Sequence, residues 1–207
     1  DLYRSFLPEI KNFTTIDEID FSGNIHGMKY HFIQTLQNPL AEMLGAEKTT
    51  DFAYWGRMKH GNDREKTIRK IYRSDLSTVM IGGFPSGVQR QSAWIKDWKQ
   101  LYPLLEPARS TLCFNWIDQT AVTGRYHEAL ACDIVPLVWQ EYDSNNILVT
   151  DDWQRCLTID DLYSKIDEIK ESNMWLNKIK TDFMNRLPKE EQYYKEFEVV
   201  LNDCIKR

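Results

Sequence analysis

The feature that most constrains the fold is an order of segments that begins near residue 50 and then repeats. A short β-branched and aromatic run, "TDFAYWG", ends at a glycine and is followed by "NDREKTIRKIYRSD". In that second segment Ile68 and Ile71 recur at helical spacing behind an Asn/Asp cap. The pattern predicts a strand, a loop and a helix, in that order.

The same order recurs along the rest of the chain. Further strands are predicted at "STVMIGGF", "STLCFNWI", "DIVPLVW" and "NILVT", and helices at "QRQSAWIKDWKQLYPLL", at "GRYHEALAC" and beyond Thr158. Strands that alternate with helices predict a parallel sheet with helices on both faces. The expected fold class is therefore α/β, with a Rossmann-like sheet.

Composition limits the partners that the whole surface can attract. The chain has 207 residues, 42% of them hydrophobic, and a net charge of -5, so only a local basic patch could attract nucleic acid. No apolar run approaches the roughly 18 residues that span a bilayer, and we expect a cytoplasmic protein without a membrane partner. Cys113, Cys132, Cys156 and Cys204 form no C-x-x-C pair, which predicts reduced thiols rather than a metal site or disulfides.

The loop after the first clear strand is the first candidate site. "GRMKHGNDRE" holds two glycines and the basic residues Arg57, Lys59, His60 and Arg64 just before a helix start. Free amides, the helix dipole and fixed cations together suit a phosphate or diphosphate. It matches neither G-x-x-x-x-G-K-[ST] nor G-x-G-x-x-G. Its pattern fits either a phosphate site or a solvated basic loop, and the following "RKIYR" could also meet a nucleic-acid backbone.

A second candidate lies in "TGRYHEALACDIVPLVWQEYD", at another junction of the predicted sheet. Arg125 and Glu128 are three residues apart and share one face near a helix start. As an exposed ion pair they would contribute only about 0.3–0.5 kcal/mol. As ligand groups, the guanidinium suits a diphosphate and the carboxylate suits a pair of sugar hydroxyls.

Read together, the two segments resemble a known family. "GRYHEALACDIVPLV" is similar to the donor-binding helix of the GT-B glycosyltransferases. More closely, the chain from about Thr50 onward resembles the second domain of the T-even phage DNA β-glucosyltransferases. That resemblance rests on "DFAYWGRMKHGNDREKTIRKI", on "TGRYHEALACDIVPLVWQEYD" and on the tail "EEQYYKEFEVVLNDCIKR".

The resemblance implies a division of the chain. Residues 1–49 would be a partial first domain or an interdomain segment, in a chain that starts without Met and that we expect to be incomplete. Residues 50–186 would form the Rossmann-like nucleotide-sugar-binding domain of a GT-B fold. Residues 187–207 would form a C-terminal helix that crosses back toward the first domain.

The resemblance also implies roles for single residues. Arg125 would bind the donor diphosphate and Glu128 the ribose hydroxyls, while Gly56 would allow close backbone approach. Arg64 would bind phosphate, and Lys59 stands where the family has a second loop arginine. The general base is expected in the first domain, and residues 1–49 offer no match for it. The sequence assigns no metal ligand and leaves a divalent metal open.

The implied function is transfer of glucose, or another sugar, from a UDP-sugar such as UDP-glucose to a hydroxymethylated base of phage DNA. The protein would act as a monomer, with double-stranded DNA as acceptor. A GT-B enzyme with a non-DNA acceptor and a non-catalytic nucleotide-binding module are the alternatives. The acidic segment from Glu141 to Asn146 is a further candidate for the donor sugar. A Cys132–His127 nucleophile is disfavoured, because the two side chains would point to different faces of a helix. Trp55 and Trp139 are predicted to be core or interface residues rather than base-stacking platforms.

Overall fold

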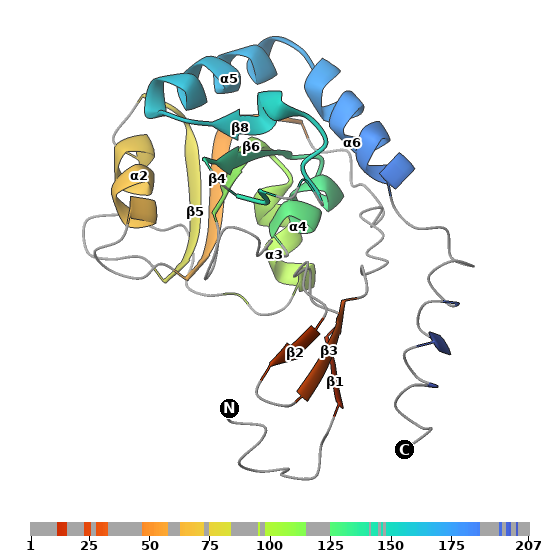
Figure 1. Cartoon of the computed structure of the whole chain (residues 1–207). Coiled ribbons are helices and arrows are strands. Elements are labelled where there is room, and N and C mark those ends of the chain that lie inside the picture. Colours follow the sequence, from red (N-terminus) through yellow and green to blue (C-terminus); the bar gives the residue numbers. More distant parts are fainter. Residues whose placement is uncertain are drawn as a thin grey trace.

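The structure is a computed structural model of the whole chain (Figure 1). The residues that it describes are 12–15, 23–25, 28–32, 47–57, 63–72, 75–83, 95, 98–114, 125–140, 142–144, 146, 148–186, 195, 198–199 and 202. Statements about the structure below refer to these residues. Among them, no helix has both the length and the apolar character that a membrane crossing requires.

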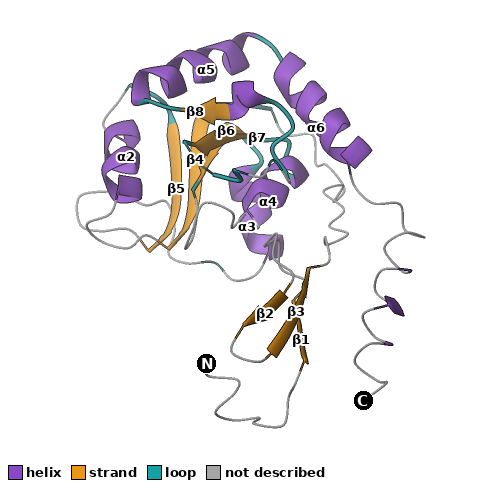
Figure 2. Ribbon diagram, in the orientation of Figure 1, coloured by secondary structure: helices purple, strands orange, loops and turns teal. Residues whose placement is uncertain are grey.

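A five-stranded parallel sheet forms the centre of the fold, in the order β5-β4-β6-β7-β8. Its strands are β4 (Thr50–Arg57), β5 (Thr78–Gly83), β6 (Ala108–Cys113), β7 (Val135–Trp139) and β8 (Arg155–Cys156). The helices are α2 (Asp63–Tyr72), α3 (Trp98–Leu105), α4 (Arg125–Ala131), α5 (Ile159–Glu171) and α6 (Met174–Arg186), with the 3-10 turn η1 (Asp152–Gln154) before β8. The predicted α/β class, with helices on both sides of a parallel sheet, is confirmed (Figure 2).

Both faces of the sheet are buried, and successive residues of β4 show why. Phe52 and Tyr54 belong to one apolar cluster, to which α2, α5, α6 and part of α4 contribute. Ala53 and Trp55 belong to a second cluster, which α3 and part of α4 complete. Because side chains of a strand alternate between faces, a strand covered on both sides must be apolar throughout. This explains the unbroken "FAYW" run.

The crossover direction reverses at β4. This strand pairs with β5 on one side and β6 on the other. The chain leaves β4 through α2 to reach β5 and then returns through α3 to reach β6. In open α/β sheets, ligands bind outside the carboxyl ends of the strands at such a reversal. The topology therefore points to the ends of β4 and β6.

The N-terminal part of the chain holds a second sheet. It has three strands in the order β1-β3-β2, namely β1 (Asn12–Thr15), β2 (Gly23–Ile25) and β3 (Met28–Phe32). β3 pairs parallel with β1 and antiparallel with β2. The sequence showed no sustained period here. The C-terminal helix predicted at 187–207 falls almost entirely outside the described residues.

One predicted strand is wrong. In "NILVT", Leu148 and Val149 are buried but form no strand. Their backbone amides donate to the Asp143 carboxylate, each at 2.8 Å, so a side chain rather than a neighbouring strand satisfies them. The last strand of the sheet is instead the two-residue β8.

Candidate functional site at the carboxyl edge of the sheet

Arg125, the first residue of α4, reaches back to the end of β4. Its Nη2 donates to the Trp55 carbonyl oxygen. Its guanidinium carbon lies 4.3 Å from the centroid of the Tyr54 ring and 5.5 Å from that of Trp55. Its Nε is buried and has no hydrogen-bond partner among the described residues. The guanidinium is thus fixed against two aromatic rings with donor capacity left over.

Glu128, one turn further along α4, also contacts Trp55. The indole Nε1 of Trp55 donates to Glu128 Oε2 at 2.6 Å. Arg125 and Glu128, both described by the structure, form no ion pair with each other. The interpretation of the two residues as a simple surface ion pair is therefore wrong, because each is bound to Trp55 instead.

The charge of Arg125 is retained despite its surroundings. Burial opposes the cation, yet the pKa of Arg125 stays above its ordinary value because neighbouring groups, Glu128 among them, favour the charged form. A guanidinium held in this way needs no reorganisation before it meets an anion.

Arg64, the second residue of α2, lies at the same edge. Its guanidinium carbon is 5.3 Å from the centroid of the Phe114 ring, and Phe114 is the residue that follows β6. The Phe114 and Tyr54 rings meet edge to face at 6.2 Å. Arg64 and Arg125 therefore each cover one member of a single aromatic pair, and two of the predicted cations are brought to one edge.

Gly56 follows Trp55 and lies beside Gly82 of β5. Both have positive φ, 118° and 126°, which L side chains rarely adopt. A Cβ added to Gly82 would lie 2.2 Å from the Gly56 carbonyl oxygen. The observed close approach at Gly56 is to its neighbouring strand, and its approach to a ligand remains a prediction.

The rest of the predicted basic loop is only partly described. Lys59 and His60 lie outside the described residues. Arg69, which was predicted to extend the positive patch, binds Glu65 at 2.7 Å within α2. Its charge is thereby balanced, so the basic stripe along α2 is weaker than the sequence indicated.

Two other candidates have structural roles. Asp143 is fully buried and accepts the two amides of its own loop, so it does not extend toward a ligand as predicted for this acidic segment. Burial raises the pKa of Cys132 to about 12 and lowers that of His127 to about 4. Neither pKa suits a thiolate–imidazolium pair, in keeping with the rejection of a Cys–His nucleophile.

An open groove of about 500 Å³ lies beside the site. It runs between α2, the end of β7 and the start of α5, and Lys70, Trp139 and Asp160 are among the residues that line it. The Trp139 ring centroid is 6.1 Å from that of Phe114, so the groove adjoins the aromatic pair that Phe114 forms with Tyr54. Among the described residues, no group of three His, Cys, Asp or Glu side chains could hold a metal ion.

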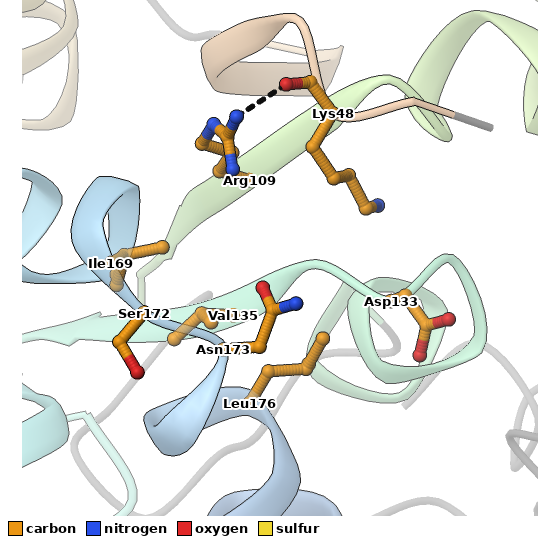
Figure 3. Close-up of a pocket in the computed structure, with 8 residues that line it drawn as sticks. All are labelled: Lys48, Arg109, Asp133, Val135, Ile169, Ser172, Asn173 and Leu176. Carbon is orange, nitrogen blue, oxygen red and sulfur yellow. Dashed lines mark hydrogen bonds between the residues drawn. The ribbon is translucent and has the colours of Figure 1, made fainter. Parts of the chain in front are cut away.

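The opposite, amino edge of the sheet carries a similar set of charges (Figure 3). Lys48 Nζ donates to the carbonyl oxygens of Glu106 at 2.6 Å and Cys132 at 2.9 Å, and Arg109 donates to the Lys48 carbonyl oxygen. Asp133 is ion-paired with Lys180. The cavity among these residues measures about 10 Å³, which leaves room for about one water molecule.

Sequence reasoning missed the residue that organises the site. Trp55 was predicted only as a core or interface residue, and that part is confirmed, since it is 4% exposed. Its hydrogen bond to Glu128 joins residues 73 positions apart. The one available signal was a tryptophan placed directly before the glycine that ends the run.

The fold has solved counterparts among glycosyltransferases. A DNA-modifying beta-glucosyltransferase, solved with and without uridine diphosphoglucose, superposes with a TM-score of 0.62 at 16% identity, over 87% of this chain and 60% of that one. The T4 phage enzyme with its UDP-glucose substrate gives 0.60 at 14% identity, over 87% and 58%. The lipopolysaccharide outer core galactosyltransferase WaaB gives 0.50 at 16%, over 83% and 53%.

These likenesses define the fold as GT-B type, Rossmann-like. The predicted resemblance to GT-B glycosyltransferases, and among them to the phage beta-glucosyltransferase, is confirmed at the level of the fold. The chain spans 60% of the length of the first of these relatives. No family profile and no curated protein sequence matches the chain significantly.

Proposed function

We propose that the chain binds a nucleotide-sugar, UDP-glucose, at the carboxyl edge of the five-stranded sheet and belongs to a glycosyltransferase. The observation that carries the proposal is the pair Arg125 and Glu128, both fixed by Trp55 where the crossover direction reverses. The fold of solved enzymes bound to UDP-glucose supports it.

Each group has a chemical task in this proposal. Arg125 binds the diphosphate, and its spare donors stabilise the negative charge that develops there as the sugar leaves. Arg64 supplies a second cation across the aromatic pair, and Lys59 a third from the loop. Glu128 accepts hydrogen bonds from the ribose hydroxyls. Gly56 gives the phosphates access to the backbone at the strand end.

The proposed acceptor is a hydroxymethylated base of double-stranded DNA. The phage DNA-modifying enzyme among the structural counterparts supports it. The general base would be a carboxylate of the first domain, and no described residue is assigned that role. A T4 phage enzyme of this fold has been solved with UDP and Mn²⁺. The described residues include no cluster of three His, Cys, Asp or Glu side chains that would hold such an ion.

The reaction is tested by incubating the full-length protein with UDP-glucose and DNA that contains hydroxymethylcytosine, with unmodified DNA as control. UDP release that requires the modified DNA is expected. Release with a different acceptor would favour a non-DNA substrate, which the net charge of -5 also suits. UDP-glucose binding without transfer to any acceptor would contradict the transferase proposal and favour a non-catalytic nucleotide-binding module.

The donor site is tested by calorimetry with UDP. Arg125→Met and Glu128→Ala each remove hydrogen bonds of a charged group, and each is expected to weaken binding about 10- to 100-fold. Lys170→Met serves as the matched control, because Lys170 is a half-exposed cation that pairs with Asp51 and Asp167 instead. Unchanged affinity in both site variants would contradict the proposed donor site.

A further inference from the structure

Trp55 contacts Arg125 and Glu128, two residues of the proposed donor site. It is 4% exposed, and its ring packs in the cluster formed with α3. Its indole nitrogen donates to Glu128, and its carbonyl oxygen accepts from Arg125. The Trp55 side chain therefore links the packed core of the sheet to the edge where the donor site is proposed.

The hydrogen bond from Trp55 limits the conformations that Glu128 can adopt. A glutamate on a helix surface samples several rotamers, and fixing it in one of them costs conformational entropy. The 2.6 Å contact between Trp55 Nε1 and Glu128 Oε2 is short and charge-assisted, so the free protein already bears that cost.

The geometry leaves Glu128 able to bind a ligand. A carboxylate has about four lone-pair sites on its two oxygens. Trp55 occupies one of them, on Oε2, and no other described residue donates to this carboxylate. The remaining sites can accept from two neighbouring hydroxyl groups, as a ribose 2′- and 3′-hydroxyl pair requires.

We infer that Trp55 is a positioning residue that sets the carboxylate of Glu128 for the ribose and so determines selectivity for a ribonucleotide over a 2′-deoxyribonucleotide. This inference rests on the proposed donor site. A 2′-deoxyribose lacks one hydroxyl and leaves part of the fixed carboxylate without a donor. A carboxylate that turns freely would follow the remaining hydroxyl or water, and the penalty would shrink.

The test measures the ratio of dissociation constants for 2′-deoxy-UDP and UDP in the full chain. The wild type is expected to prefer UDP at least about 10-fold, the usual effect of losing a hydrogen bond to a charged group. Trp55→Phe keeps an aromatic ring and the carbonyl oxygen but removes the N–H, and it is expected to lose most of that preference. Glu128→Ala should lose it too, and the double variant should differ little from Glu128→Ala.

The outcomes separate the inference from the proposed function. A wild type that binds UDP without preferring it over 2′-deoxy-UDP would reject the ribose role of Glu128, and this inference with it. If the wild type discriminates and Glu128→Ala does not, full discrimination by Trp55→Phe would overturn the inference and leave the donor site intact. The ratio compares two ligands on one protein, so partial unfolding of a variant does not mimic the effect.

A second measurement applies if Trp55→Phe does not fold. The indole proton of Trp55 is followed by NMR in the wild type, identified as the indole resonance that responds to Glu128→Gln. It should lie downfield in the wild type, move upfield in Glu128→Gln, and move more with UDP than with 2′-deoxy-UDP. No indole resonance that responds to Glu128→Gln, or equal shifts with both nucleotides, would overturn the inference.

Discussion

The two edges of the central sheet carry the same kinds of charged residues and use them differently. At the amino edge, Lys48 and Arg109 donate to backbone carbonyl oxygens, and Lys180 is paired with Asp133. At the carboxyl edge, Arg125 keeps a buried Nε without a partner among the described residues.

The two edges differ in how much hydrogen-bonding capacity their charged groups leave unused. Buried polar groups that bind only one another stabilise a fold, and the amino edge closes around a cavity of about 10 Å³. A charged group held in place with spare hydrogen-bonding capacity is prepared for a ligand. Charge at a sheet edge therefore does not identify a site by itself, and the donor site proposed at the carboxyl edge also rests on the Nε of Arg125, which is unpaired among the described residues.

The largest effect is expected from Gly82→Ala, which breaks the carboxyl edge itself. The new Cβ would lie 2.2 Å from the Gly56 carbonyl oxygen, at a φ of 126°. The clash and the backbone strain together should lower the free energy of unfolding by more than about 3 kcal/mol. Urea unfolding measures this, with Gly83→Ala as control because Gly83 has no positive φ. Equal stability of both variants would contradict the close approach.

Low pH should destabilise α4, which carries Arg125 and Glu128 of the proposed donor site, through protonation of His127. The pKa of this buried imidazole is about 4 in the folded chain, against an ordinary value of 6.5. Between these values the unfolded chain binds more protons, so stability falls as the pH falls. From pH 7.5 to 5.0 this group should remove about 2 kcal/mol from the free energy of unfolding. His127→Gln should lose that part of the pH dependence, and an unchanged dependence would reject the assignment.

Lys48→Met sharpens the comparison between the edges. It leaves the carbonyl oxygens of Glu106 and Cys132 without their donor, which should cost about 1.5 kcal/mol of stability. Burial lowers the pKa of Lys48 because it disfavours the charged amine. Replacing that amine by an uncharged side chain therefore offsets part of the cost. UDP affinity should stay at the wild-type value, whereas Arg125→Met should lose affinity. Thermal unfolding measures the stability of both variants, and calorimetry measures their UDP affinity. A loss of UDP binding in Lys48→Met would contradict the separate roles of the two edges.

The strands and helices of the sheet could be predicted because their signals are local. Apolar runs that end at glycine gave β4 and β5, and the spacing of Ile68 and Ile71 gave α2. The positions of Arg125 and Arg64 at helix starts on the same edge of the sheet followed from the parallel topology.

The rest depends on contacts between distant residues. The role of Trp55 requires the packing of α4 against β4, and no local pattern encodes that hydrogen bond. The misplaced last strand has a similar cause, because the buried carboxylate of Asp143 competes for the amides that a strand would use. Apolar periodicity records burial, but it does not record which polar partner a buried amide finds.

The smallest effect is expected at Asp151, which belongs neither to the proposed donor site nor to the residues around the amino-edge cavity. Its side chain caps η1 through Trp153 N and pairs with Lys178. The hydrogen bond from Lys178, followed by that from Trp153 N, lowers the pKa of Asp151, so its contribution holds at neutral pH and is lost as the pH falls through the lowered value. Asp151→Ala should cost about 1 kcal/mol by urea unfolding and leave UDP affinity unchanged. A change in affinity would extend the site beyond the carboxyl edge.

The central claim is that the carboxyl edge binds the nucleotide-sugar while the amino edge only stabilises the fold. Hydrogen–deuterium exchange of the full chain, with and without saturating UDP-glucose, tests it most directly. Protection is predicted in peptides that contain Trp55 with Gly56 and in those that contain Arg125 with Glu128, and none around Lys48 and Arg109. Protection confined to the amino edge, or none at either edge, would contradict the account.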